Sequence, residues 1–156
     1  MYKVNTFVEP HYPIKRALLF KVATLAMESV NVHGKVELTV SVIGNRKMRQ
    51  LNGKYRGIPE TTDVLSFSLA EDKAQFVNPP DTKALYLGDV VISYPEAISQ
   101  AAEESILIEE KVAFLLVHGL LHLLGYDHVK PAEEMVMTKV HEAIMKKIKF
   151  EVSLDG

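Results

Sequence analysis

The sequence predicts an α+β protein: a small mixed sheet of about four strands packed with helices, in a single domain over residues 1–156. The length of 156 residues is enough for one domain with a full core and too short for two comfortable ones. The apolar content of 47% is typical of a globular protein and argues against disorder. Segments with strand-like alternation and segments with helical periodicity follow one another along the chain, which predicts helices packed on a sheet.

Four elements are expected in the N-terminal part. Residues 2–8 alternate loosely and predict an edge strand. Pro13 is expected to open a helix that extends to about residue 30, because a missing N–H costs little in the first helical turn. Residues 35–43 are the clearest strand, since valine and leucine alternate there with polar residues and predict one buried face. Asn45 is the expected N-cap of a short helix.

The remaining elements are expected to be two strands followed by three helices. Residues 64–69 predict a short strand, and residues 70–83, which have no usable period, predict a surface loop. Strand character resumes at Leu85, and Ser93 is expected to cap a helix that begins near Pro95. Two more helices are expected, over about residues 108–124 and from Pro131 onward.

The stretch HGLLHLLGYDH, residues 118–128, carries the strongest sign of chemistry. His118 and His122 lie four apart in a helical run, so both imidazoles project from one face and can bind one metal ion. Gly125 is where this helix is expected to end in a left-handed conformation, after which the chain can return His128 as a third ligand. Three histidines without a fourth protein ligand predict an open metal site on a helix that is otherwise buried.

The spacing of these histidines matches the HExxHxxGxxH signature of the metzincin zinc peptidases, with one difference. The peptidase signature has a glutamate, the general base, directly after its first histidine, and this chain has Gly119 there. The alternative is that these are ordinary histidines of the core. That interpretation suits a single histidine better than three at metal spacing, because each buried imidazole needs a polar partner. His141, on the last helix, is expected to be ordinary.

A basic stretch, NRKMRQLNGKYRGI over residues 45–58, is the second notable segment. It holds five arginine and lysine residues and no acid. Most of these side chains are expected on a solvated helix face. Arg56 is expected in a loop after a break at Gly53, and loops on rigid strands are where functional side chains tend to lie. A guanidinium can hold a phosphate with two parallel hydrogen bonds, which a lysine cannot do.

Both segments resemble the YbeY family of bacterial metal-dependent endoribonucleases. HGLLHLLGYDH meets every fixed position of the family signature H-G-x-L-H-L-x-G-Y-D-H. LNGKYRGIPETTDVLSFSL is similar to the family's second motif and places its catalytically implicated arginine at Arg56, although Ser68 stands where the family commonly has proline. The resemblance covers about residues 45–128. It implies a single-strand-specific endoribonuclease that acts in rRNA maturation, including 16S rRNA 3′ end processing, and in ribosome quality control.

The resemblance also implies RNA as partner, as rRNA or ribosomal subunits. Lys54, in the basic stretch, is a possible RNA-binding residue. One zinc ion per chain is expected, with Ni²⁺ or another divalent ion as the alternative, because imidazole suits several of them. Such a zinc site lowers the pKa of its water to about 7. Arg56 is the cation expected to offset the charge that grows on the phosphate. Either the activated water or a neighbouring 2′-hydroxyl is the nucleophile.

Two acids have a structural and a functional interpretation. Asp127 either forms the turn or orients a histidine or the water, as a second-shell residue of the metal. Asp89 is expected to be structural rather than a partner of an imidazole. Two alternative functions also stay open: a zinc metallopeptidase-like hydrolase, which only the histidine spacing favours, and a non-catalytic ribosome-assembly factor in which the metal is structural.

The bulk composition adds the expected location. The net charge is −2, so the average charge does not indicate nucleic acid. The chain has no cysteine, which excludes disulfides and thiolate metal sites and fits a reducing compartment. The first residues lack the apolar core of a signal peptide, and the apolar run around the histidines is too short to span a bilayer. A cytoplasmic protein without membrane attachment is expected; the oligomeric state is not predicted.

Overall fold

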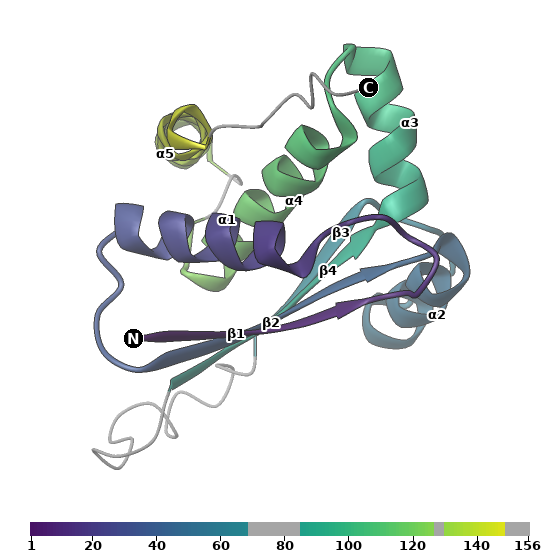
Figure 1. Ribbon diagram of the computed structural model, residues 1–156, viewed down its shortest axis with the longest axis horizontal. Helices are drawn as coiled ribbons and strands as arrows, with labels where there is room; N and C mark the ends of the chain where they lie inside the picture. Colours follow the sequence, from purple (N-terminus) through teal and green to yellow (C-terminus); the bar gives the residue numbers. More distant parts are fainter. Residues whose placement is uncertain (69–84, 127–129, 149–156) are drawn as a thin grey trace.

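A computed structural model describes residues 1–68, 85–126 and 130–148 (Figure 1). Strands and helices follow one another along the chain in the order expected from the sequence. In chain order the elements are β1 (Tyr2–Val8), α1 (Arg16–Ser29), β2 (Val36–Ile43), α2 (Asn45–Arg56), β3 (Val64–Ser68), β4 (Leu85–Ser93), α3 (Tyr94–Glu104), α4 (Ile108–Leu123) and α5 (Pro131–Lys147).

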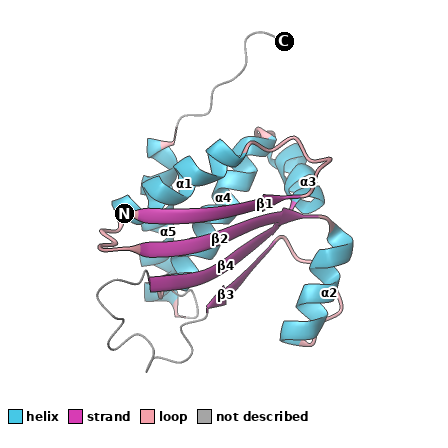
Figure 2. Ribbon diagram, turned by 60° about the horizontal axis from the view of Figure 1, so that its bottom comes forward, coloured by secondary structure: helices cyan, strands magenta, loops and turns pink. Residues whose placement is uncertain are grey.

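The described strands form one mixed sheet in the order β1-β2-β4-β3. β2 pairs in parallel with both β1 and β4, and β3 pairs antiparallel with β4. β1 and β3 are therefore the two edges of the sheet, which Figure 2 shows face-on. This arrangement confirms the predicted α+β fold and the predicted edge position of residues 2–8.

Helices lie on both faces of the sheet, and the two faces differ in size. On the larger face, α1 packs on β1, and α4 packs on β3 and β4. Buried residues of both helices share one core cluster with the alternate residues of β2 that the sequence predicted to be buried, Val36, Leu38, Val40 and Val42. α2 contributes Met48 to a smaller cluster with Ile43, Leu65 and Val91. Figure 1 shows α1, α4 and α5 together above the sheet and α2 apart from them at its far end.

The side chains of the edge strand β3 point alternately to the two faces of the sheet. Ser66 and Val64 face α4, while Leu65 and Phe67 belong to the cluster with α2. The helix of the two histidines and the basic helix therefore flank the same strand from opposite sides of the sheet.

α4 ends as the sequence predicts, at a glycine with positive φ. Gly125 has a φ of +97°, a conformation that residues with a Cβ rarely adopt. The Gly125 N–H donates to the carbonyl of His122 at 3.1 Å, and the Tyr126 N–H donates to that of Leu121 at 3.0 Å. This pair of bonds is the Schellman motif, which stops the helix directly after His122, at Leu123.

Three sequence-based expectations about helix ends are wrong. α1 begins at Arg16 rather than at Pro13, because Lys15 is still extended. Gly44, not Asn45, is the N-cap of α2, and the Asn45 side chain instead accepts hydrogen bonds from the hydroxyls of Thr61 and Ser93. The predicted cap at Ser93 is confirmed, since its hydroxyl accepts from the Glu96 N–H at 3.3 Å.

The third wrong expectation concerns Arg56. The predicted break at Gly53 does not occur, and α2 continues through it to Arg56 and ends at Gly57, whose φ is +71°. A helical Gly53 is possible because a glycine inside a helix lowers its stability by only about 1 kcal/mol. Arg56 is therefore the last residue of a helix and not part of a loop. The loop expected over residues 70–83 lies outside the described residues.

Candidate metal and RNA site

His118 and His122 lie one above the other on α4, as their spacing requires. Their Nε2 atoms are 3.2 Å apart, and their ring centroids are 4.7 Å apart. Both side chains are partly exposed, although most of their neighbours on α4 are buried. The helix therefore brings the same nitrogen of both rings to one point at its surface.

This arrangement fits a shared metal ion. Two imidazoles that bind zinc at about 2.0–2.1 Å in tetrahedral geometry have nitrogens about 3.3 Å apart, close to the 3.2 Å observed. Within residues 1–68, 85–126 and 130–148, no group of three or more His, Cys, Asp and Glu side chains could hold a metal ion. The predicted third ligand, His128, and the predicted orienting acid, Asp127, lie outside those residues, so the three-histidine site stays a prediction.

Gly119, which replaces the glutamate of the peptidase signature, faces the sheet rather than the histidine surface. A Cβ at this position would lie 2.7 Å from Cγ1 of Val90, 3.0 Å from Oγ of Ser66 and 3.2 Å from Cγ2 of Val64. The Ser66 hydroxyl also donates to the Gly119 carbonyl at 2.9 Å. The close approach of α4 to β3 and β4 leaves no room for a side chain here, so this fold cannot hold a base at the peptidase position.

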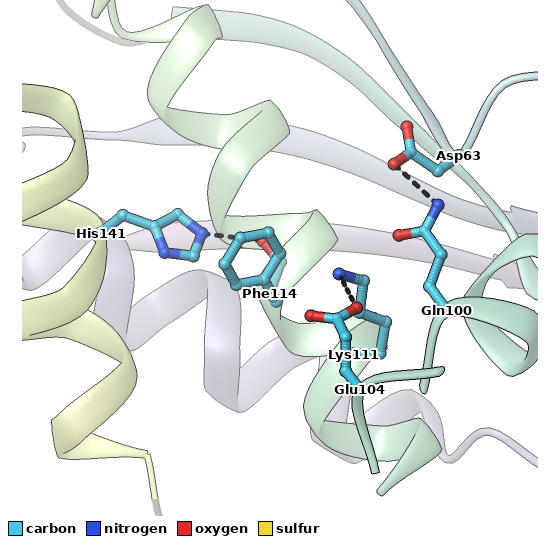
Figure 3. Close-up of polar contacts among 6 residues, drawn as sticks. All are labelled: Asp63, Gln100, Glu104, Lys111, Phe114 and His141. Carbon is cyan, nitrogen blue, oxygen red and sulfur yellow. Dashed lines mark hydrogen bonds and ion pairs between the residues drawn. The ribbon is translucent and has the colours of Figure 1, made fainter. Parts of the chain in front are cut away.

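A cavity of about 290 Å³ lies beside His118, between α4 and α5. His141 on α5 is 5% exposed, and its Nε2 donates to the carbonyl of Phe114 at 3.0 Å (Figure 3). Burial lowers the pKa of His141 below its ordinary value of 6.5, and the hydrogen bond to Phe114 opposes that shift in part. Its ring centroid is 6.3 Å from that of His118. The cavity is lined by Phe114, His118, Glu134, Met137, Thr138, His141 and Glu142.

The sequence indicates neither this cavity nor the burial of His141. The sequence places His141 beside the apolar stripe of α5, and only the contact with α4 shows that it belongs to that stripe. A fully buried imidazole needs a polar partner. The Phe114 carbonyl supplies it, and no feature of the local sequence indicates that pairing.

Polar contacts near the start of α4 hold the helix in place. The ammonium of Lys111, buried on α4, lies 2.7 Å from the carboxylate of Glu104 at the end of α3. Gln100 of α3 donates to the carboxylate of Asp63, just before β3, at 3.2 Å. Figure 3 shows both contacts beside the pair of His141 and Phe114. α3 therefore ties the first turn of α4 to the start of the edge strand.

Arg56 is the last residue of α2, the helix that packs on the other face of the sheet from α4. Within the described residues its guanidinium forms no hydrogen bond or ion pair, and the residue is exposed. Its neighbour Tyr55 packs on Phe67 of β3, with ring centroids 4.8 Å apart. Figure 2 shows α2 beyond the ends of the strands, on the side where β3 is the edge. The helices that carry the arginine and the histidines thus contact the same edge strand from its two sides.

Asp89 is structural, as the sequence analysis expected. It accepts a hydrogen bond from the hydroxyl of Tyr86 at 2.7 Å, within β4. Its neighbour Val90 faces α4, so Asp89 points to the opposite face of the sheet from His118. An acid in this position cannot orient an imidazole on α4.

Comparison with known proteins identifies the family. The sequence model described as Endoribonuclease YbeY matches residues 12–149. The chain belongs to the YbeY family. A YbeY relative from Roseiflexus sp. is 40% identical, and the match covers 92% of this chain and 91% of the relative. A relative from Dehalococcoides mccartyi is 37% identical over 94% of this chain and 90% of its own length. Both relatives are named Endoribonuclease YbeY.

A solved structure supports the fold of this YbeY chain. A solution structure of a protein from Thermotoga maritima superposes with a TM-score of 0.59 at 23% identity, over 92% of this chain and 90% of that one. At this identity the likeness concerns the fold alone. No helix in the described part of the chain is both long and apolar enough to cross a membrane.

Proposed function

We propose that this protein is a metal-dependent endoribonuclease that cleaves single-stranded RNA, with ribosomal RNA as its substrate during maturation and quality control. Membership of the YbeY family confirms the sequence-based prediction of an endoribonuclease, because its relatives carry that activity in their names. The 3′ end of 16S rRNA is the proposed cleavage region. The absence of cysteine fits action in the reducing cytoplasm.

The observation that carries this proposal is the pair of histidines next to a glycine that faces the sheet. The Nε2 atoms of His118 and His122 are 3.2 Å apart, which suits one shared ion. Gly119 has no space for the carboxylate that a peptidase needs to protonate an amine leaving group. Phosphodiester cleavage releases an alkoxide rather than an amine. A cation near the leaving oxygen therefore contributes more to phosphodiester cleavage than to peptide cleavage.

The proposed ligands are His118, His122 and His128, with zinc as the proposed ion and Ni²⁺ or another divalent ion as the alternative. When bound, such an ion is a Lewis acid that activates water near neutral pH. The helix contributes by holding two imidazoles in fixed orientation before the ion arrives. Asp127, between the helix end and His128, is the proposed partner that orients a ligand.

Arg56 is the proposed catalytic cation and Lys54 a proposed RNA contact. Both belong to the last turn of α2, and Arg56 is exposed and without an ion pair in the described residues. A guanidinium without a protein counter-ion is available to the two non-bridging oxygens of a phosphate. RNA that lies across the β3 edge can reach both the α4 side and the α2 side of the sheet. We therefore propose that the substrate crosses this edge.

The test compares RNA and protein substrates with the same preparation. Metal-loaded protein is incubated with structured ribosomal RNA and with casein, each with and without chelator. We expect chelator-sensitive cleavage of RNA and none of casein. Strong chelator-sensitive cleavage of casein would overturn the proposal in favour of a peptidase. Metal-loaded protein that binds RNA but does not cleave it would favour the assembly-factor alternative.

A second measurement separates chemistry from binding at Arg56. Single-turnover cleavage at saturating enzyme removes affinity from the comparison. We expect Arg56→Ala to lower the rate by about 10² or more, the usual scale for losing one preorganised charge donor. Arg56→Lys should restore only part of the rate, because lysine keeps the charge and loses the two-pronged geometry. Arg49→Ala, on the same helix, is the matched control and should leave the rate unchanged.

A further inference from the structure

Tyr55 presents an aromatic ring to solvent from the last turn of α2. Its side chain is 57% exposed, among the largest values for an apolar or aromatic residue in the described chain. One part of the ring packs on Phe67 of β3, with centroids 4.8 Å apart and planes tilted by 54°. The contact with the sheet thus holds the ring in place while more than half of the residue stays exposed to solvent. An aromatic ring with this support loses little conformational freedom when another ring stacks on it.

The charge around Tyr55 is positive. The two chain neighbours of Tyr55 are Lys54 and Arg56, and no residue from Asn45 to Arg56 is acidic. The Lys54 ammonium lies 5.2 Å from the centroid of the Tyr55 ring. That ammonium sits on a flexible stem and can turn outward to a phosphate, which leaves the ring face to another planar group. An exposed aromatic ring flanked by cations is the combination with which proteins bind single-stranded nucleic acids.

The position of Tyr55 connects this surface to the histidine helix. On one face of β3, Phe67 packs against the Tyr55 ring. On the other face, the hydroxyl of the neighbouring Ser66 donates a hydrogen bond to the Gly119 carbonyl. Gly119 directly follows His118 in α4. A single β-strand therefore lies between the Tyr55 ring and the backbone that carries the first metal-binding histidine.

We propose that Tyr55 is a stacking platform for one unpaired RNA base, next to the phosphate that Arg56 binds. This inference rests on the proposed endoribonuclease function and extends it to a specific contact. The platform explains why single strands are the substrate: a base inside a duplex is already stacked on both faces and cannot reach the ring. Recognition by stacking is tolerant of base identity, because every base has a π-face. Tyr55 then positions the strand and does not take part in the chemistry.

The chain offers a direct probe because it contains no tryptophan. Tyr55→Trp places the protein's one tryptophan at the platform, where it can be excited separately from the remaining tyrosines. A base that stacks on the indole quenches its emission. The ligand is a 2′-O-methyl RNA oligomer, confirmed uncleaved by electrophoresis, titrated into metal-loaded protein at about 0.1 M salt, where exposed charges are largely screened. We expect saturable quenching by the single strand. We expect none with an abasic oligomer of equal length or with a duplex.

A second tryptophan variant is the matched control. Phe20 on α1 is 47% exposed and has Lys21 beside it, so Phe20→Trp also creates an exposed indole next to a cation. That indole should not be quenched by any of the three ligands. Equal quenching at both positions, or equal quenching by the abasic oligomer, would overturn the proposal, because charge attraction rather than stacking would then explain the signal.

Binding by otherwise unlabelled variants completes the test. Tyr55→Ala should weaken affinity for the single strand by about tenfold or more, within the range known for loss of a base–aromatic stack. Tyr55→Phe should bind like the parent, because only the ring is needed. Parent-like affinity of Tyr55→Ala in a protein that still cleaves single-stranded RNA would refute the platform and leave the proposed function intact. Absence of both binding and cleavage in the parent would instead refute the proposed function.

Discussion

Replacing Gly119 by alanine tests the contact that joins the histidine helix to the sheet. The new Cβ would lie 2.7 Å from Cγ1 of Val90 and 3.2 Å from Cγ2 of Val64. Both neighbours are β-branched and have few rotamers, so they cannot move aside. The added methyl group must therefore push α4 away from β3 and β4.

Three contributions set the size of the effect. Overpacking in a core lowers the free energy of unfolding by about 1–3 kcal/mol. The 2.9 Å hydrogen bond from Ser66 to the Gly119 carbonyl would weaken, with up to about 1 kcal/mol lost. Alanine favours the helix over glycine by about 1 kcal/mol, which offsets part of this loss. We expect a net destabilisation of about 2 kcal/mol, or a fall in Tm of roughly 4–8 °C for a chain of this size.

Gly53→Ala is the control, because the same substitution there meets no crowding. Gly53 also lies inside a helix, α2, and its nearest contact would be Pro59 Cα at an ordinary 3.6 Å. Urea unfolding, followed by circular dichroism with and without metal, should show Gly53→Ala at least as stable as the parent. Gly119→Ala should be less stable in both conditions. Parent-like stability of Gly119→Ala would show that α4 does not pack on the sheet as closely as described.

Three further outcomes follow from the site. His122→Ala should lose the bound ion in elemental analysis, and stoichiometric ion retained in that variant would contradict the ligand assignment. For His141, whose pKa is lowered in the folded state, the unfolded state takes up a proton first as the pH falls through about 6.5. Stability should therefore decline below that pH, and less so in His141→Gln, which keeps a donor for the Phe114 carbonyl; identical pH profiles would refute this role. Glu104→Gln should lower the Tm, because it leaves the buried ammonium of Lys111 without a counter-ion. Glu103→Gln, at a neighbouring exposed position that forms no ion pair among the described residues, should not.

Local sequence was sufficient for the elements and for the pair of histidines. The alternation of Val36 to Val42 defines a strand with one buried face, since side-chain direction in a strand depends only on residue parity. The spacing of His118 and His122 puts both rings on one face, because a helix repeats every 3.6 residues. Gly125 marks the helix end, because few other residues adopt a positive φ. Each of these features is determined within a few residues of chain.

Contacts between distant segments were decided only by the tertiary structure. The sequence shows that Gly119 replaces a glutamate, but only the 2.7 Å approach to Val90 shows why no side chain fits there. The burial of His141 depends on a carbonyl 27 residues away. The expected loop around Arg56 is helical instead, because α2 packs Met48 and Leu51 on the sheet and this packing outweighs the cost of a glycine in the helix. Such contacts depend on how the chain folds back on itself, and local periodicity carries no information about that.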